Sequence, residues 1–195
     1  MSTLYVDSIQ PKTTGQAITV ASTYQTGAVL QTVVHQEDGM ATFSMNGTND
    51  ILFLASNASD STTHLSLSIT PKSSNSKILL STTIFHEING VINYNSLWGF
   101  YRDSTKLGAS AVGSRRGGIA VTSIGYDLPD TATTPDMASY QYYDSPNTTS
   151  AITYAVSVNH SNSGGTMYIN RTVNDTDSTS TERGISILIA QEIGG

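Results

Sequence analysis

The stretch at residues 65–85, LSLSITPKSSNSKILLSTTIF, constrains the fold more than any other part of the sequence. From Leu65 to Ile69, apolar residues alternate with serine or threonine, which is typical of a β-strand with one face toward solvent. Pro71 interrupts the pattern, a turn rich in serine and asparagine follows, and residues 78–85 resume as an apolar, β-branched run. Two such runs around a short turn predict a β-hairpin. Because a hairpin alone is marginal in water, it needs further strands to pack against.

Short apolar or alternating runs separated by turns continue along the chain. Further strands are expected at residues 27–34, 40–45, 51–55, 96–102 with a return at 106–107, 119–124, 137–143, 151–158, 167–171 and 185–193. The last of these is nearly continuous in apolar residues, which is expected of a strand inside a sheet. No stretch of useful length has a period of 3.6. Short strands with turn signals at intervals of about 8–12 residues predict a β-sandwich or barrel.

The composition excludes several classes of protein. The 195-residue chain has no cysteine, which excludes a disulfide scaffold, thiol catalysis and cysteine metal sites. Its net charge of -6 argues against binding nucleic acid, which requires clustered cations. No run of about 18 apolar residues occurs, so we expect no membrane insertion. The N-terminus, MSTLYVDSIQ, lacks the features of a signal peptide, and we expect synthesis in a cytoplasm.

Residues 1–26 are predicted to be an attachment or oligomerisation segment. Their short alternating pieces cannot bury a core of their own, so they need other copies or a larger body; the alternative is a frayed terminus. The residues expected at the attachment or trimer interface are Leu4, Val6, Ile9, Ile18 and Val20. Residues 27–195 are predicted to form the head, with its core from about residue 60. We therefore predict an all-β fold, an antiparallel, jelly-roll-like β-sandwich head behind a short N-terminal β segment.

Several blocks of the sequence resemble one family of proteins. These blocks are LYVDSIQPKTTGQAITV, GAVLQTVV, LSLSITPKSSNSKILL, FYRDSTKLG, YYDSPNTTSAITYAV and GGTMYINRT. They are similar to recurrent blocks in the small tail-fibre or virion structural proteins of marine tailed phages, in particular cyanophage-like ones. The resemblance covers most of the chain, and residues 35–64 and 108–136 are covered least. No block is a catalytic motif.

The resemblance implies a role in a virus particle. It implies a homotrimeric fibre subunit that attaches by its N-terminus to other virion proteins of the tail, baseplate or capsid. The C-terminal head would then recognise a host-surface glycan or lipopolysaccharide. This chain is short for the family and lacks a long shaft. The alternative is therefore a decoration or cement protein of the capsid or tail without receptor binding.

Tyrosines and one arginine pair are the candidate ligand-binding residues. Tyrosine combines a flat apolar ring with a hydroxyl, which suits stacking on sugars or protein partners. The arginines lie in a Gly-rich loop and suit an anionic glycan or an acidic partner. The candidates are Tyr126, Tyr140, Tyr142, Tyr143, Arg115 and Arg116. Alternatively, the tyrosines divide between the core and a subunit interface, and the arginines belong to an ordinary solvated loop.

Neither a metal site nor a cofactor is predicted. His86 and Glu87 are adjacent in an expected strand, and we interpret them as a pair at its rim, without the helical spacing of a zinc motif. Asp175, Asp177 and Glu182 lack the spacing of an EF-hand and are expected in a solvated acidic loop. A trimer axis could still bring three copies of one histidine around an ion. The histidines share no ligand spacing: His35, His64, His86 and His160.

Enzymatic activity is not expected. The sequence contains neither a nucleophile elbow nor a phosphate-binding loop. A hydrolase of the tail-spike type would need two carboxylates facing each other across a groove. Asp127, Asp130, Asp136 and Asp144 are candidates only by their proximity in the sequence.

Overall fold

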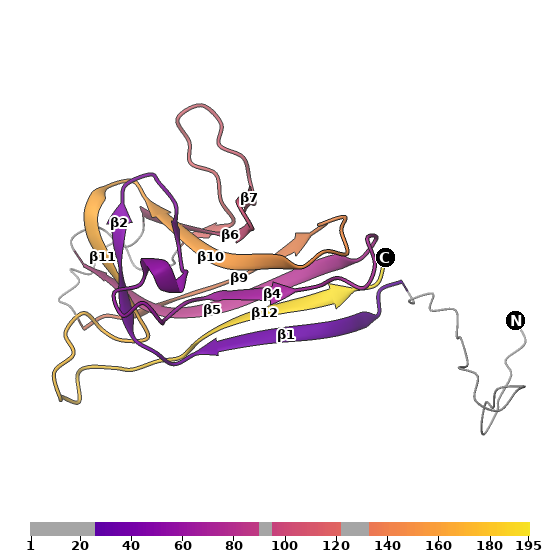
Figure 1. Cartoon of the computed structure of the whole chain (residues 1–195). Coiled ribbons are helices and arrows are strands. Elements are labelled where there is room, and N and C mark those ends of the chain that lie inside the picture. The colour runs from indigo at the N-terminus through magenta and orange to yellow at the C-terminus, as the bar shows by residue number, and fades with distance from the viewer. Residues whose placement is uncertain (1–25, 90–94, 122–132) are drawn as a thin grey trace, which may run out of the picture.

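The structure is a computed structural model that describes residues 26–89, 95–121 and 133–195. These residues form two antiparallel sheets that face each other (Figure 1). Sheet A contains β1 (Val29–Glu37), β2 (Ala41–Asn46), β5 (Lys77–Asn89), β9 (Asp136–Asp144), β11 (Ser163–Ile169) and β12 (Ser186–Ile193). Sheet B contains β3 (Ile51–Leu52), β4 (Ser66–Ile69), β6 (Ser96–Arg102), β7 (Thr105–Leu107), β8 (Ala120–Val121) and β10 (Ile152–His160).

The one helical element that lies wholly within the described residues is a short 3₁₀ turn, η1 (Ala55–Asn57). None of these residues belongs to a helix with the length and apolar character needed to cross a membrane. The five apolar residues expected at an N-terminal attachment interface, at positions 4–20, lie outside the described residues. The role expected of residues 1–26 therefore stays a prediction.

The strands pair from the two ends of the chain inward. β1 pairs with β12, β4 with β10, β5 with β9, and β6 with β7, all antiparallel. These four pairs of strands are divided between two sheets. Their strand orders are β1-β12-β5-β9 in sheet A and β4-β10-β6-β7 in sheet B. This is the jelly-roll arrangement, in which two sheets close over one core. The predicted jelly-roll-like sandwich is confirmed.

The prediction of a hairpin at residues 65–85 is wrong. β4 and β5 do form where the alternation places them, but β4 pairs with β10 in sheet B, whereas β5 pairs with β9, β11 and β12 in sheet A. The connection through Pro71 therefore crosses from one sheet to the other. Leu67 on β4 and Ile78 and Leu80 on β5 are buried in the same core. Alternation indicates which side of each strand is buried, but it does not identify the neighbouring strand.

The connection between β4 and β5 is held by a buried carboxylate. Glu192 Oε1 accepts a hydrogen bond from Lys72 N at 2.7 Å, and Glu192 Oε2 accepts one from Gln31 Nε2 at 2.6 Å. Burial on its own would raise the pKa of Glu192, but hydrogen bonds from the Gln31 side chain and the Lys72 backbone lower it below the usual value. Hydrogen bonds to the charged form of a carboxyl group favour its ionisation. The ionised Glu192 carboxylate therefore holds the connection against β1 and β12.

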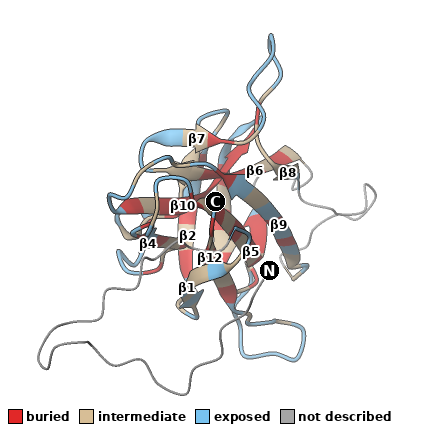
Figure 2. Cartoon of the chain, turned by 90° about the vertical axis from the view of Figure 1, so that its right-hand side faces the viewer, coloured by how far each residue is buried: buried red, intermediate tan, exposed pale blue. Residues whose placement is uncertain are grey.

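The core contains large aromatic side chains from both sheets. Phe43 and Phe53 lie with ring centroids 4.6 Å apart, and Phe53 meets Trp98 edge-on at 5.8 Å. Figure 2 views the molecule from the end that carries the C-terminus and shows buried residues on both sheets. Phe43 is 1% exposed and Phe53 is fully buried. The core therefore does not begin near residue 60, as expected from the sequence, because β2 and the segment after β3 contribute to it.

The other expected strands overlap strands of the structure, but the strand expected at 51–55 is limited to β3 and is followed by η1. The runs at 96–102 and 106–107 form the β6–β7 hairpin, in which Phe100 lies opposite Leu107. On β10, Tyr154, Val156 and Val158 are fully buried on one face. β12 lies between β1 and β5, in the interior position expected from its apolar sequence. Residues 122–124 of the strand expected at 119–124 lie outside the described residues.

Candidate functional site

The predicted tyrosines lie on opposite faces of β9. Tyr140 points into the core, where its ring lies 4.8 Å from that of Phe100 and its hydroxyl donates to the Gly99 carbonyl at 2.9 Å. Burial raises the pKa of Tyr140 well above its usual value. Tyr142 is partly buried against the core, whereas Tyr143 is 55% exposed on the outer face of sheet A. Tyr143 is therefore the member of this trio that is open to a partner, and Tyr126 lies outside the described residues.

The predicted arginine pair is also divided. Arg115 is exposed at the tip of the loop between β7 and β8. The guanidinium of Arg116 turns inward, donating to Asn159 Oδ1 at 2.7 Å and to the Asn95 carbonyl at 2.8 Å. Burial lowers the pKa of Arg116 below its usual value. Arg116 thus anchors the loop on sheet B, and Arg115 is the arginine of the pair that a ligand could reach.

Arg116 is part of a polar network on the outer face of sheet B. Asn159 donates to Asp50 Oδ1 at 2.6 Å, and the ammonium of Lys106 lies 2.8 Å from both oxygens of the same carboxylate. The hydroxyl of Tyr101 donates to Asp50 Oδ2 at 2.8 Å. This carboxylate already accepts hydrogen bonds from three side chains, so it is occupied by the protein's own donors. We interpret the network as a cover for the sheet.

His86 and Glu87 are not at the rim of a strand, contrary to the interpretation from the sequence. Both are fully buried, because β5 continues between β9 and β11. The His86 ring meets Trp98 edge-on at 4.8 Å. Glu87 accepts hydrogen bonds from the backbone N–H groups of Thr134 at 2.9 Å and Val173 at 2.7 Å. This carboxylate fastens two loops to the end of the sandwich.

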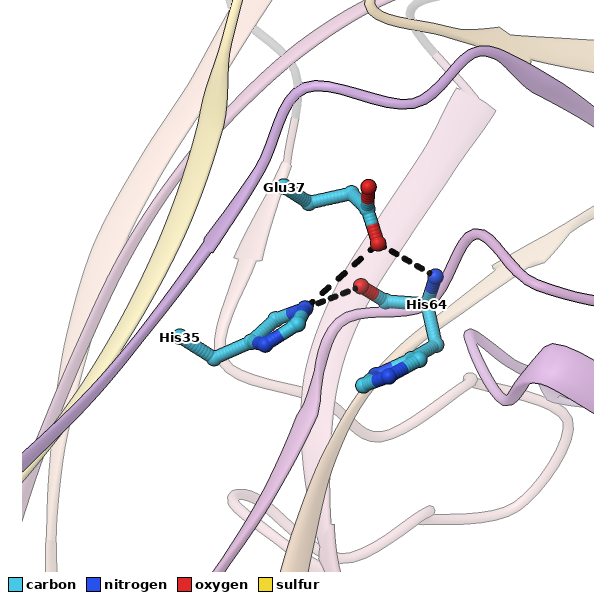
Figure 3. A group of neighbouring side chains, drawn as sticks. All are labelled: His35, Glu37 and His64. Atoms are coloured by element: carbon cyan, nitrogen blue, oxygen red, sulfur yellow. Dashed lines mark hydrogen bonds and ion pairs between the residues drawn. The ribbon is translucent and has the colours of Figure 1, made fainter.

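A cluster of His35, Glu37 and His64 lies at the seam between the sheets (Figure 3). His35 and Glu37 are on β1, the edge strand of sheet A, and His64 precedes β4 at the edge of sheet B. Glu37 Oε2 accepts the His64 backbone N–H at 2.9 Å, and Glu37 Oε1 accepts that of Gly39 at 2.8 Å. Sequence spacing did not reveal this cluster, because two residues 29 positions apart are joined only by the closure of the sandwich.

The geometry of this cluster favours a proton donor at His35. Its Nε2 lies 2.9 Å from the His64 carbonyl oxygen and 3.5 Å from Glu37 Oε2. Because a carbonyl oxygen can only accept a hydrogen bond, Nε2 carries a proton in this arrangement. The rings of His35 and His64 are stacked, with centroids 4.2 Å apart and an angle of 12° between their planes.

This arrangement differs from that of a metal centre. In the described part of the chain, His35, Glu37 and His64 are the one group of three ligating side chains close enough to hold an ion. A metal-binding imidazole nitrogen presents its lone pair in the plane of the ring, about 2 Å from the ion. The lone pairs of two stacked rings do not converge on one point. The cluster as it stands is a hydrogen-bonded clasp between the sheets.

The loop between β11 and β12 carries the acidic residues considered for calcium. Asp175 lies 2.6 Å from Arg183 and 3.5 Å from Arg171, so its carboxylate is paired with cations of the chain itself. Asp177 is exposed. The loop surrounds a hollow of about 410 Å³ lined by Asp175, Thr176, Asp177, Ser178, Thr181 and Arg183. The carboxylate of Asp177 and the hydroxyl groups of this loop suit hydrogen bonding to a polar ligand.

Comparisons with known proteins place few limits on the function. No family model matches the chain, and no curated protein matches it. One similar solved structure is the infectious bursal disease virus VP2 subviral particle, at 11% sequence identity and a TM-score of 0.33. The similarity covers 85% of this chain and 38% of that one, so the chain spans less than half the length of VP2. Similarity of this degree carries no functional conclusion.

Proposed function

We propose that this chain is a structural protein of a virus particle, a trimeric fibre subunit without enzymatic activity. Its N-terminal segment attaches it to other virion proteins, and its sandwich faces the host surface. The sequence blocks shared with small tail-fibre proteins support the role in the particle. The observation that carries the proposed orientation is the position of the chain ends on the sandwich.

Both ends of the described chain meet at one end of sheet A. The Gly27 N–H donates to the Gly194 carbonyl at 2.7 Å, and the Gly194 N–H donates to the Ala28 carbonyl at 2.8 Å. The loop between β11 and β12 lies at the opposite end of the sandwich (Figure 1). Residues 1–25 therefore join the head at the end far from this loop. Attachment through these residues would leave the β11–β12 loop at the free end of the particle.

The composition of this distal loop supports contact with a glycan. Residues 174–180 read NDTDSTS, all of them exposed. Hydroxyl, amide and carboxylate groups form directional hydrogen bonds with sugar hydroxyls, and loops on a rigid scaffold commonly carry binding residues. The hollow inside the loop gives such a ligand a concave surface.

An adsorption experiment tests the proposal. Purified full-length protein, added to host cells before the virus, is expected to reduce adsorption. The double variant Thr176→Ala/Asp177→Ala changes two exposed side chains of the distal loop and is expected to compete less well. The matched control Ser110→Ala lies in the exposed β7–β8 loop and is expected to compete like the unmodified protein.

The same experiment separates fibre from decoration protein. Failure of the purified protein to affect adsorption, together with loss of particle stability in its absence, would identify a decoration or cement protein. If the protein is absent from purified particles, the virion role itself is wrong. Localisation of the subunit in intact particles by electron microscopy distinguishes these results.

A further inference from the structure

Four strands of sheet A, β1, β12, β5 and β9, form an outer surface that carries almost no charge. Strand register places its side chains in rows across four strands, so that Val34 lies beside Ile189, Ile189 beside Ser81, and Ser81 beside Gln141. The face, called here the A face, consists of Thr32, Val34, Gln36, Lys77, Leu79, Ser81, Thr83, Phe85, Met137, Ser139, Gln141, Tyr143, Ile187, Ile189, Gln191 and Ile193.

Large apolar side chains project from the A face. Val34 is 53% exposed, Met137 is 56% exposed and Tyr143 is 55% exposed. Ile187 and Ile189, between them, are partly exposed. Four strands and four rows of side chains cover roughly 500 Å² in plan at the usual strand and residue spacings. Half of the residues on this face are apolar, and exposed apolar side chains grouped on one face are typical of an interaction site.

The charge pattern indicates what kind of partner fits the A face. The chain carries 15 acidic residues and a net charge of -6, yet no acidic residue belongs to the A face, and Lys77 is its one charged member. Two copies of an acidic protein repel each other, and a contact between them avoids like-charge repulsion best where the surface is neutral. A basic or acidic partner would find almost no charge to pair with on this face. The A face therefore suits a second copy of this chain.

The position of the N-terminus favours the same partner. Residues 1–25 join the head at Gly27, at the end of sheet A where β1 begins and β12 ends. Copies that pack through their A faces with their strands in the same direction bring these ends of sheet A near one another. The N-terminal segments that are predicted to oligomerise would then start from neighbouring positions. Contact between the heads would raise the effective concentration of the segments, and contact between the segments would raise that of the heads.

We propose that the A face is the contact between copies of this chain in the oligomer. This inference rests on the proposed function for its premise that the protein works as an oligomer, and it adds which surface joins the heads. The contact buries the exposed parts of Val34, Tyr143 and Met137 against the neighbouring copy. The smallest specific interfaces bury about 600 Å² per partner, close to what the patch and its protruding side chains provide.

Light scattering coupled to size exclusion tests the inference on the full chain. The unmodified protein is expected to be an oligomer, and the double variant Val34→Glu/Tyr143→Glu is expected to have the mass of a monomer. Both positions are more than half exposed in one copy, so the new charges add little strain to the isolated head. A cooperative thermal transition of the variant shows that the monomer is folded. The matched control Val112→Glu/Val121→Glu changes two equally exposed valines away from the A face and is expected to remain an oligomer.

Two results would overturn the inference, and they have different meanings. If the Val34→Glu/Tyr143→Glu variant keeps the full oligomer mass, the heads do not join through the A face, although the proposed oligomeric fibre stands. If the unmodified protein is a monomer at every concentration, the trimeric part of the proposed function fails as well. Because the A face lacks paired charges, the oligomer is also expected to persist in 1 M salt. Salt at about one tenth of this concentration already screens surface charges that are more than about 10 Å apart.

Discussion

The outer face of sheet B is covered by the chain's own residues, whereas the A face of sheet A is open. On β10, the outward positions Ala155, Ser157 and Asn159 are 4%, 0% and 1% exposed. On β1 and β9, the outward positions Val34 and Tyr143 are more than half exposed. Both sheets are built from strands with the same alternation, so the difference comes from what lies on top of them.

The cover of sheet B consists of polar side chains and a loop. Asp50 gathers Tyr101, Lys106 and Asn159, and Arg116 holds the β7–β8 loop on Asn159. The A face has no comparable network among the described residues, and its side chains are mostly apolar or neutral. Farther along β5, the outward Glu87 is covered by the loops that carry Thr134 and Val173. A sheet face that is covered within the chain stabilises the fold of a single copy. An open neutral face adds stability only when another molecule covers it.

Removing the centre of the sheet B network has the largest expected effect. Asp50→Ala deprives Tyr101, Lys106 and the buried Asn159 of their shared acceptor. Because unpaired buried donors and charges are costly, we expect the free energy of unfolding to fall by about 3 kcal/mol. Urea denaturation measures it. Ser139→Ala on the A face is the control, with a change of no more than about 0.5 kcal/mol. Equal effects at both positions would contradict the distinction between the two faces.

The two adjacent arginines give a sharper comparison within one loop. Arg116→Ala loses charge-assisted hydrogen bonds to Asn159 and Asn95, and we expect it to lower the free energy of unfolding by about 1.5 kcal/mol. Arg115→Ala, at an exposed side chain, is expected to change it by less than about 0.5 kcal/mol. Denaturant titration of the two variants side by side measures the difference. A larger loss for Arg115→Ala would show that the loop is held in another way.

Tyr101 makes the cover of sheet B sensitive to alkaline pH. Burial, the hydrogen bond to Asp50 and the charge of Asp50 raise the pKa of Tyr101 to about 12. The pKa of Tyr101 is higher in the folded chain than its unfolded value near 10. The contribution of Tyr101 to the free energy of unfolding is therefore complete below pH ~10 and is lost as pH rises toward ~12. Tyr101→Phe is expected to reduce this alkaline loss by about 1 kcal/mol, measured by denaturation at pH 9 and near pH ~12. Tyr140 and Tyr154 are buried in both proteins, so their ionisation cancels in the comparison. Parallel pH profiles would exclude this role for Tyr101.

The smallest expected effect is that of zinc on the thermal stability of the clasp formed by His35, Glu37 and His64. Because His35 Nε2 donates to the His64 carbonyl and the two rings are stacked, we expect saturating Zn²⁺ to leave the melting temperature unchanged within about 1 °C. His35→Ala is expected to cost about 1 kcal/mol through the lost hydrogen bond. A zinc-dependent rise in melting temperature that disappears in His64→Ala would instead identify a metal centre.

Parts of the candidate surfaces were predictable from residue types. Tyr143 was singled out as a residue for binding, and it is exposed on the A face. Tyr140, singled out for the same reason, is buried, because alternation along β9 turns it toward Phe100. Arg115 and Arg116 are indistinguishable in the sequence, and only the position of Asn159 beneath the loop separates them. No pattern predicted the cluster of His35, Glu37 and His64.

The sequence by itself determined that the protein is all-β, where the strands lie, and which side of many strands is buried. These properties depend on the local alternation of apolar and polar side chains, which repeats every two residues. Only the tertiary structure decided which strands are neighbours. β4 and β5 are adjacent in sequence and lie in different sheets, whereas β1 and β12 come from opposite ends of the described chain and pair. Pairing is set by closure of the whole sandwich over one core, and this closure also left the A face uncovered.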